Sequence, residues 1–356
     1  MKIETAGRSA SRVCLPGYPE VSIRFEWALT FTSLWILAGL FLDGWAHTNI
    51  PETIDSFFTP WHLTLYSGLV ASIAVLGITY LSNLRKGYTW LRALPPAYMR
   101  SVLGAIIFVV AGNLDFIWHS LFGFEENVEA LVSPSHLSLA VGGVLMISGP
   151  LRLAWERSRS GDNKIPWPAL LSLFTVLGVF TFFTSFSSAF AHPHLVIGEV
   201  PAADTYLWDT TLISYVLIPS ALLMGFILTA ILRWKLPLGS LTLLIAGNSL
   251  LLFVMTWSYS RDYWQVLIAA LLGGILADVL LHVLQPSPER VKALRWFSFL
   301  VPAMLFLLYF LSLILTHGIW WNSNMWLGMI FFSGMTGLGL SWLAVPPYSS
   351  DTSVSK

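Results

Sequence analysis

The sequence has little charge for its length. Of its 356 residues, only 11% are Asp, Glu, Lys or Arg, whereas a soluble domain carries about 25%. Apolar residues make up 56% of the chain, and at about 20 residues per bilayer crossing they are enough for roughly ten spans. The composition leaves too little polar surface for a soluble protein, which excludes soluble enzyme folds. It predicts an all-α polytopic membrane protein whose main partner is the lipid bilayer.

Cysteine and a net charge are also missing. Cys14 is the only cysteine, which excludes an intramolecular disulfide and any cysteine-based metal site. The 19 basic and 19 acidic residues balance, so no net basic field attracts nucleic acid. The patterns GxxxxGKS/T, GxGxxG, GxSxG and HExxH are absent, which leaves nucleotide hydrolysis, dinucleotide binding and protease chemistry without support. A metal site in this chain must therefore use histidine and carboxylates.

Ten long apolar runs are separated by polar breaks, and we predict a transmembrane helix for each. The runs lie near residues 27–47, 61–82, 101–121, 135–155, 167–190, 211–232, 238–258, 264–284, 297–316 and 325–344. With a cytoplasmic N-terminus, every Lys and Arg except Arg261 falls on the cytoplasmic side. The positive-inside rule therefore predicts that both termini are cytoplasmic, in a plasma or inner membrane.

These spans divide the chain into five predicted parts. They are a cytoplasmic segment (1–26), a transmembrane region that contains a repeat (27–155), a basic cytoplasmic loop (156–166), a transmembrane region of six further helices (167–345) and a cytoplasmic tail (346–356). Of the eight histidines, only His282 lies away from the outer ends of helices and the outer loops. Topology does not require this clustering, so it is the first indication of function.

Residues 41–68 and 113–142 share a pattern of polar residues. Both contain DxxxH near the end of a predicted helix and, after a loop, TPxH or SPxH at the start of the next helix. The matching residues, 72 or 74 positions apart, are Asp43 with Asp115, His47 with His119, His62 with His136, Glu52 with Glu126 and Asp55 with Glu129. We therefore predict an internal repeat of helix, outer loop, helix hairpins, in which spans 1 and 2 correspond to spans 3 and 4.

The spacing within each copy favours a metal site on the extracytoplasmic side. Residues i and i+4 share one face of a helix, so Asp43 and His47 are expected to lie side by side. Thr59 is expected to cap the next helix, which places His62 in its first turn, where the helix dipole favours a neutral imidazole. The corresponding ligands of the second copy are Asp115, His119 and His136. One carboxylate and two imidazoles suit copper, iron or zinc.

Other polar residues allow more than one interpretation. The acidic residues of the outer loops are Glu52, Asp55, Glu126 and Glu129. They are further ligands, acceptors that orient the imidazoles, or solvated charges. Asp278 and His282 form a third DxxxH inside the eighth span, either as an intramembrane relay or as a helix contact and an interfacial histidine. His192 and His194, in AHPHL, either face one metal or a water-filled opening, or are solvated loop residues.

The segment DSFFTPWH at 55–62, preceded by Asp43 and His47, resembles the copper-ligand segment in the C subunit of the copper membrane monooxygenases, which oxidise methane or ammonia. In that family, a DxxxH pair on one transmembrane helix is followed by a histidine on the next helix, after a D...FTPSH stretch. The resemblance implies that Asp43, His47 and His62 are copper ligands. It also implies a second, diverged set in the other copy and a copper-dependent, oxygen-activating function.

Three functions are compatible with the sequence. The first is an oxygen-activating or electron-transfer protein, either as a subunit of a larger membrane oxidoreductase or as a homo-oligomer. The second is a metal or proton-coupled transporter, with the outer sites as its entry. The third is a non-catalytic protein that holds copper or assists assembly. Copper is the metal we expect, with iron and zinc as alternatives.

Overall fold

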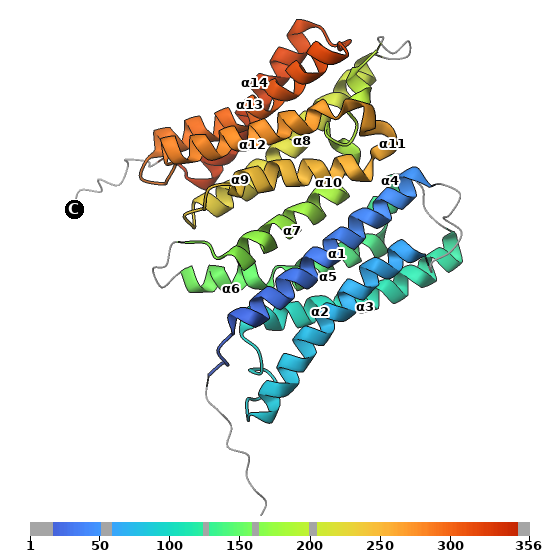
Figure 1. Ribbon diagram of the computed structural model, residues 1–356, viewed down its shortest axis with the longest axis vertical. Coiled ribbons are helices and arrows are strands. Elements are labelled where there is room, and N and C mark those ends of the chain that lie inside the picture. Colours follow the sequence, from blue (N-terminus) through green and yellow to red (C-terminus); the bar gives the residue numbers. More distant parts are fainter. Residues whose placement is uncertain (1–16, 51–58, 124–127, 159–163, 199–204, 348–356) are drawn as a thin grey trace, which may run out of the picture.

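The computed structural model describes residues 17–50, 59–123, 128–158, 164–198 and 205–347, which form an all-α fold (Figure 1). In these ranges an isolated bridge between Lys164 and Lys235 is the one β-type pairing. The α-helices are α1 (Ile23–Asn49), α2 (Pro60–Arg85), α3 (Pro96–Phe122), α4 (Val128–Val132), α5 (Pro134–Ile147), α6 (Gly149–Arg157), α7 (Trp167–Phe183), α8 (Thr205–Ile231), α9 (Ser240–Thr242), α10 (Asn248–Met255), α11 (Trp257–Ser260), α12 (Gln265–Leu284), α13 (Val291–Thr316) and α14 (Ser323–Ala344). The π-helix η5 (Leu243–Gly247) joins α9 to α10, and the 3₁₀ turns are η3 (Ser185–Ser187), η4 (Pro193–Val196) and η6 (Arg261–Tyr263).

By length and hydropathy, the chain is a multi-pass membrane protein. Seven helices of the described part are long and apolar enough to cross a membrane: α1, α2, α3, α8, α12, α13 and α14. Two more candidate spans are bent pairs, α5 with α6 at 47° and the helix 240–255 with 257–263 at 100°. The predicted span that falls short is α7, whose 17 residues cover roughly 26 Å at about 1.5 Å per residue, against a hydrocarbon core of about 30 Å.

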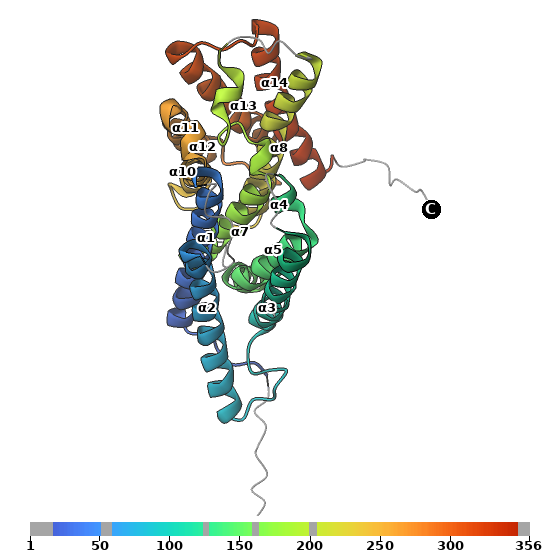
Figure 2. The ribbon, with the colours of Figure 1, turned by 90° about the vertical axis from the view of Figure 1, so that its right-hand side faces the viewer.

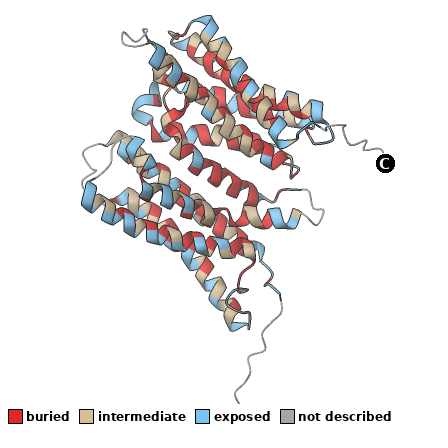
Figure 3. Ribbon diagram, turned by 180° about the vertical axis from the view of Figure 1, so that it is seen from behind, coloured by how far each residue is buried: buried red, intermediate tan, exposed pale blue. Residues whose placement is uncertain are grey.

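Helix α7 lies in the middle of the molecule and contacts helices from both the N-terminal and the C-terminal part of the chain. It packs against α1, α6, α8 and α10, and it appears almost entirely red in the view coloured by burial (Figure 3). Leu170, Leu173 and Leu177 are at most 1% exposed. A helix that is apolar on all sides is expected to be enclosed by protein or lipid, and here the protein encloses it.

The outward faces of the peripheral helices are apolar, as a bilayer requires. Leu63, Val70 and Ile78 lie along one side of α2 and are 69%, 65% and 70% exposed. In water, such a continuous apolar stripe would be a liability for aggregation. In lipid it is the expected surface, because lipid chains are as apolar as these side chains.

Two helical hairpins, α1–α2 and α3–α5, face each other at one end of the molecule (Figure 2). In each hairpin, the two helices are in close backbone contact at a glycine. A Cβ atom on Gly68 would lie 3.0 Å from the backbone nitrogen of Ile36 in α1, and one on Gly142 would lie 2.7 Å from that of Phe108 in α3. Because glycine lets the two backbones approach, the end of the first helix lies close beside the start of the second in both hairpins.

The sequence predicts one continuous helix over 135–155, but the structure divides it into α5 and α6. Pro150 has no backbone N–H to continue the helical ladder. The Arg152 side chain binds at the break, where its Nη2 donates to the carbonyl oxygens of Ala97 (2.7 Å) and Leu145 (2.8 Å) and to Oγ of Ser101 (2.9 Å). These bonds tie the bend to α3 and so fix the second hairpin at its far end.

Candidate metal centre

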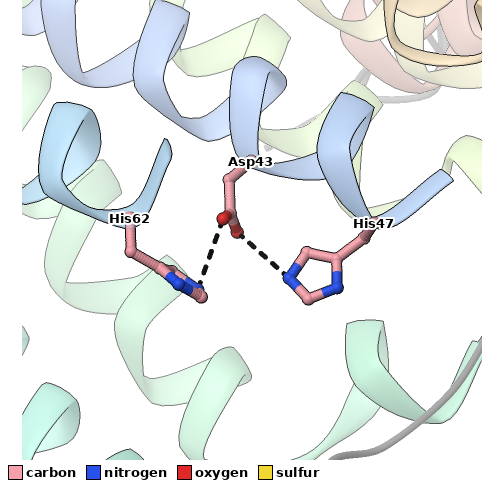
Figure 4. A group of neighbouring side chains, drawn as sticks. All are labelled: Asp43, His47 and His62. Atoms are coloured by element: carbon pink, nitrogen blue, oxygen red, sulfur yellow. Dashed lines mark ion pairs between the residues drawn. The ribbon is translucent and has the colours of Figure 1, made fainter. Parts of the chain in front are cut away.

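Asp43, His47 and His62 meet where α1 ends and α2 begins (Figure 4). Nε2 of His47 is 3.8 Å from Oδ2 of Asp43, and Nε2 of His62 is 3.3 Å from Oδ1 of Asp43. The centroids of the two imidazole rings are 5.8 Å apart. One carboxylate therefore lies between two imidazoles that come from different helices.

The start of α2 orients His62. Thr59 is the N-cap and Pro60 the first helical residue, and Oγ1 of Thr59 accepts a hydrogen bond from the backbone N–H of His62 (3.3 Å). The same hydroxyl is hydrogen bonded to Nδ1 of the His62 ring at 2.8 Å. Because Nδ1 is held by the cap, the other ring nitrogen, Nε2, points to Asp43. The N-cap predicted from the sequence is thus confirmed, and it also positions the ring.

The second group, Asp115, His119 and His136, repeats this arrangement on α3 and α5. Nε2 of His119 is 3.5 Å from Oδ2 of Asp115, and Nε2 of His136 is 3.6 Å from Oδ1. The ring centroids are 5.6 Å apart. Ser133 caps α5, and its Oγ is hydrogen bonded to Nδ1 of His136 at 2.7 Å. We refer to the two groups as the first and second triads.

The hydrogen bond of His119 identifies the atom that faces Asp115. Its Nδ1 lies 3.2 Å from the carbonyl oxygen of Gly123. A carbonyl oxygen only accepts, so Nδ1 carries the hydrogen and the lone pair of the neutral ring is on Nε2. That lone pair faces a carboxylate oxygen, which is unfavourable unless a proton or a metal ion lies between them.

Both aspartates have a buried oxygen without a hydrogen bond. These atoms are Oδ1 of Asp43 and Oδ1 of Asp115, and Asp115 as a whole is 3% exposed. A buried carboxylate oxygen without a donor is costly. In each triad, one nitrogen from each ring and one carboxylate oxygen lie within 4.8 Å of one another. Bonds of about 2.0–2.2 Å to a common ion need only a small inward movement from this arrangement, so the residues fit a metal ion.

The two triads are neighbours, and Tyr66 lies near both aspartates. Asp43 and Asp115 are close enough to interact electrostatically, and the charges of both act on the Tyr66 hydroxyl. A Cβ atom on Gly112, three residues before Asp115, would be 3.7 Å from that hydroxyl oxygen. Tyr66 is absent from the residues proposed on sequence grounds. Its one local signal is its position four residues after His62, on the same helix face.

The remaining predicted residues lie apart from the triads or outside the described ranges. Glu129 is exposed on α4, and Glu52, Asp55 and Glu126 are outside the described residues. Asp278 is 2% exposed and accepts hydrogen bonds from the backbone nitrogens of Leu241 (3.1 Å) and Thr242 (2.9 Å) and from the Thr242 hydroxyl (2.7 Å). It therefore caps the start of α9. Nδ1 of His282 bonds the backbone oxygen of Asp278 at 2.8 Å.

Comparisons with protein-family models, with curated proteins and with solved structures find no match for this chain. Fold and site together define an integral membrane protein with two Asp/His/His triads that could hold a metal ion.

Two buried aspartates should respond in opposite ways to loss of charge. In chelator-treated protein, Asp115→Asn should leave the thermal stability unchanged or raise it, because the substitution removes a buried charge whose Oδ1 has no hydrogen-bond donor. The matched variant Asp278→Asn should lose about 1–3 kcal/mol, since the amide cannot accept all three hydrogen bonds. Thermal unfolding of the two variants in detergent measures the difference. Equal destabilisation of both would show that the Asp115 carboxylate is satisfied without an ion.

Proposed function

We propose that the chain is a membrane metalloprotein that binds one copper ion at each triad and takes part in oxygen activation or electron transfer. The observation that carries this proposal is the same in both hairpins. One carboxylate and two Nε2 atoms converge, and the carboxylate keeps a buried oxygen without a hydrogen-bond donor. A single proton could join the carboxylate to only one of the two imidazoles, whereas one metal ion could contact the carboxylate and both imidazoles.

The ligand set suits a transition metal such as copper, zinc or iron, and the resemblance of the first triad selects copper among them. Imidazole nitrogen suits copper, zinc and iron, and the triads contain no sulfur. The resemblance of the first triad to the copper-ligand segment of the copper membrane monooxygenases supports copper among these. When bound, copper supplies one-electron and oxygen chemistry. Three protein ligands leave coordination positions open, as a reactive metal site requires.

The other residues of the site hold the ligands in place. The hydroxyls of Thr59 and Ser133 fix the Nδ1 atoms of His62 and His136, and the Gly123 carbonyl fixes that of His119. A hydrogen bond at the second ring nitrogen sets the tautomer and the orientation of a ligating histidine. The Tyr66 hydroxyl lies within electrostatic reach of both aspartates, where it is suited to hold a proton near the triads.

We further propose that the two hairpins are copies of one unit and that their triads face the extracytoplasmic side. Gly68 and Gly142, like His62 and His136, are 74 positions apart, and each packs on a residue of the preceding helix, Ile36 or Phe108, which are 72 positions apart. The ten-span topology with cytoplasmic termini rests on the distribution of Lys and Arg.

A protein that stores copper or hands it to a partner is the second candidate, because both triads lie at the ends of helices, where an ion has a short path from the membrane surface. A transporter would need a path to Asp278 and His282, and that relay is still a prediction. Tight copper binding without oxygen consumption would favour storage.

Metal analysis tests the proposal directly. Protein purified in detergent without chelator, or reloaded with copper, should contain two copper ions at the triads, one in each. His47→Ala with His62→Ala should remove one of them, and His119→Ala with His136→Ala the other. His317, which is exposed and belongs to neither triad, provides the matched control His317→Ala, which should retain both ions. Folded protein that takes up no copper, iron or zinc would refute the metal sites.

The Thr59 hydroxyl should matter for affinity at one triad only. Thr59→Val removes the bond to Nδ1 of His62 and should weaken copper binding at the first triad by about 10–100-fold. The second triad of the same molecule should keep its affinity and serves as an internal reference. The control is Thr64→Val, since that hydroxyl only bonds the Pro60 carbonyl of its own helix. Competition titration with a copper chelator measures both sites. Unchanged affinity in Thr59→Val would show that the cap does not orient the ligand.

A further inference from the structure

His192 and His194 form a second kind of histidine group, outside both triads. They lie at η4, in the connection between α7 and α8. Their ring centroids are 5.9 Å apart. The ring of Tyr259 in α11 contacts both, at 6.3 Å from His192 and 5.5 Å from His194, and Tyr215 in α8 is 5.9 Å from His192. Two imidazoles thus share an aromatic enclosure built from three parts of the chain.

The surroundings of both rings favour the neutral form. Burial lowers the pKa of His192 to about 4, with a further contribution from the neighbouring His194. Burial also lowers the pKa of His194. The neutral imidazole is the form that binds metals. Nδ1 of His194 is in addition buried without a hydrogen-bond partner, which is a cost that a bound ion at that atom would remove.

The separation of the rings is suitable for one shared ion. Two imidazoles bound to one metal at about 2.0–2.1 Å have centroids roughly 5 Å apart at a tetrahedral angle and roughly 6.3 Å apart in a linear arrangement. The observed 5.9 Å is close to the 5.8 and 5.6 Å of the two triads. The difference lies in charge: within the described residues, neither histidine of the pair forms an ion pair with Asp or Glu, whereas each triad contains an aspartate.

We propose that His192 and His194 form a third metal site, which binds a cuprous ion between two neutral imidazoles. A divalent ion would leave two charges uncompensated in this partly buried enclosure, whereas a monovalent ion leaves one. Cuprous copper also accepts two nitrogen ligands without further donors. The tyrosine rings add aromatic faces near the pair, which attract a bound cation.

The pair lies at the same end of the helices as the first triad. Asn49, two residues after His47, donates from Nδ2 to the Met255 carbonyl oxygen (3.0 Å) and accepts from the backbone nitrogen of Ser258 (2.8 Å). Tyr259, which encloses the histidine pair, follows Ser258 directly. These contacts join the end of α1 to the α10–α11 bend and place the third site near the first triad without shared ligands.

An anaerobic titration with cuprous ion tests this site separately from the triads. The protein carries His47→Ala, His62→Ala, His119→Ala and His136→Ala, and bathocuproine disulfonate is the competing chelator. We expect one cuprous ion per chain in this background. Adding His194→Ala should lower its affinity at least tenfold, and adding the control His317→Ala should not. X-ray absorption of the loaded background should show two nitrogen neighbours and no sulfur.

The outcomes separate the two proposals. A background that is folded, as judged by its thermal transition, but binds no cuprous ion would refute the third site and leave the triads standing. Equal effects of His194→Ala and His317→Ala would refute it as well. If the background does not fold, the same comparison is made in the wild-type chain, where His194→Ala should reduce the total from three ions to two. A total that stays the same would overturn the proposal.

Discussion

The structure of this end of the protein depends on a buried carboxylate placed between two imidazoles. Asp43 and Asp115 each have an oxygen that is shielded from solvent and accepts no hydrogen bond, and each is approached by two Nε2 atoms at 3.3–3.8 Å. In a low-dielectric surrounding, such an arrangement is stable only when positive charge compensates the carboxylate. A metal ion bound there would provide that charge and would use the imidazole lone pairs at the same time. Asp278 is the instructive contrast, because backbone and hydroxyl donors satisfy it fully.

The hairpins supply the precision that such a site requires. Close contact at Gly68 and Gly142 brings the end of one helix against the beginning of the next, so ligands from two helices reach one point. The N-caps then hold the imidazoles by their Nδ1 atoms. At the far end of the second hairpin, Arg152 secures the bend between α5 and α6. The glycine contacts and the N-caps occur in both hairpins, and together they set the orientation of the triad side chains.

Local rules predicted which side chains meet in each triad, whereas tertiary contacts explain what the sequence did not reveal. The DxxxH spacing and the caps at Thr59 and Ser133 depend on residues at most four positions apart, and the structure brings together all six predicted triad residues. Tyr66 was missed because its role arises from the packing of α2 on α3. The break at Pro150 and the short α7 were also missed, since hydropathy records apolar length and not where protein, rather than lipid, encloses a helix.

Anomalous diffraction at the copper absorption edge, from crystals of the copper-loaded protein, tests the central claim most directly. The account predicts one peak in each triad, at about 2.0–2.2 Å from Nε2 of His62 in the first and of His136 in the second. Copper-loaded crystals that show these side chains clearly but give no anomalous peak at either triad would contradict it, and the buried aspartates would then be neutralised by protons alone.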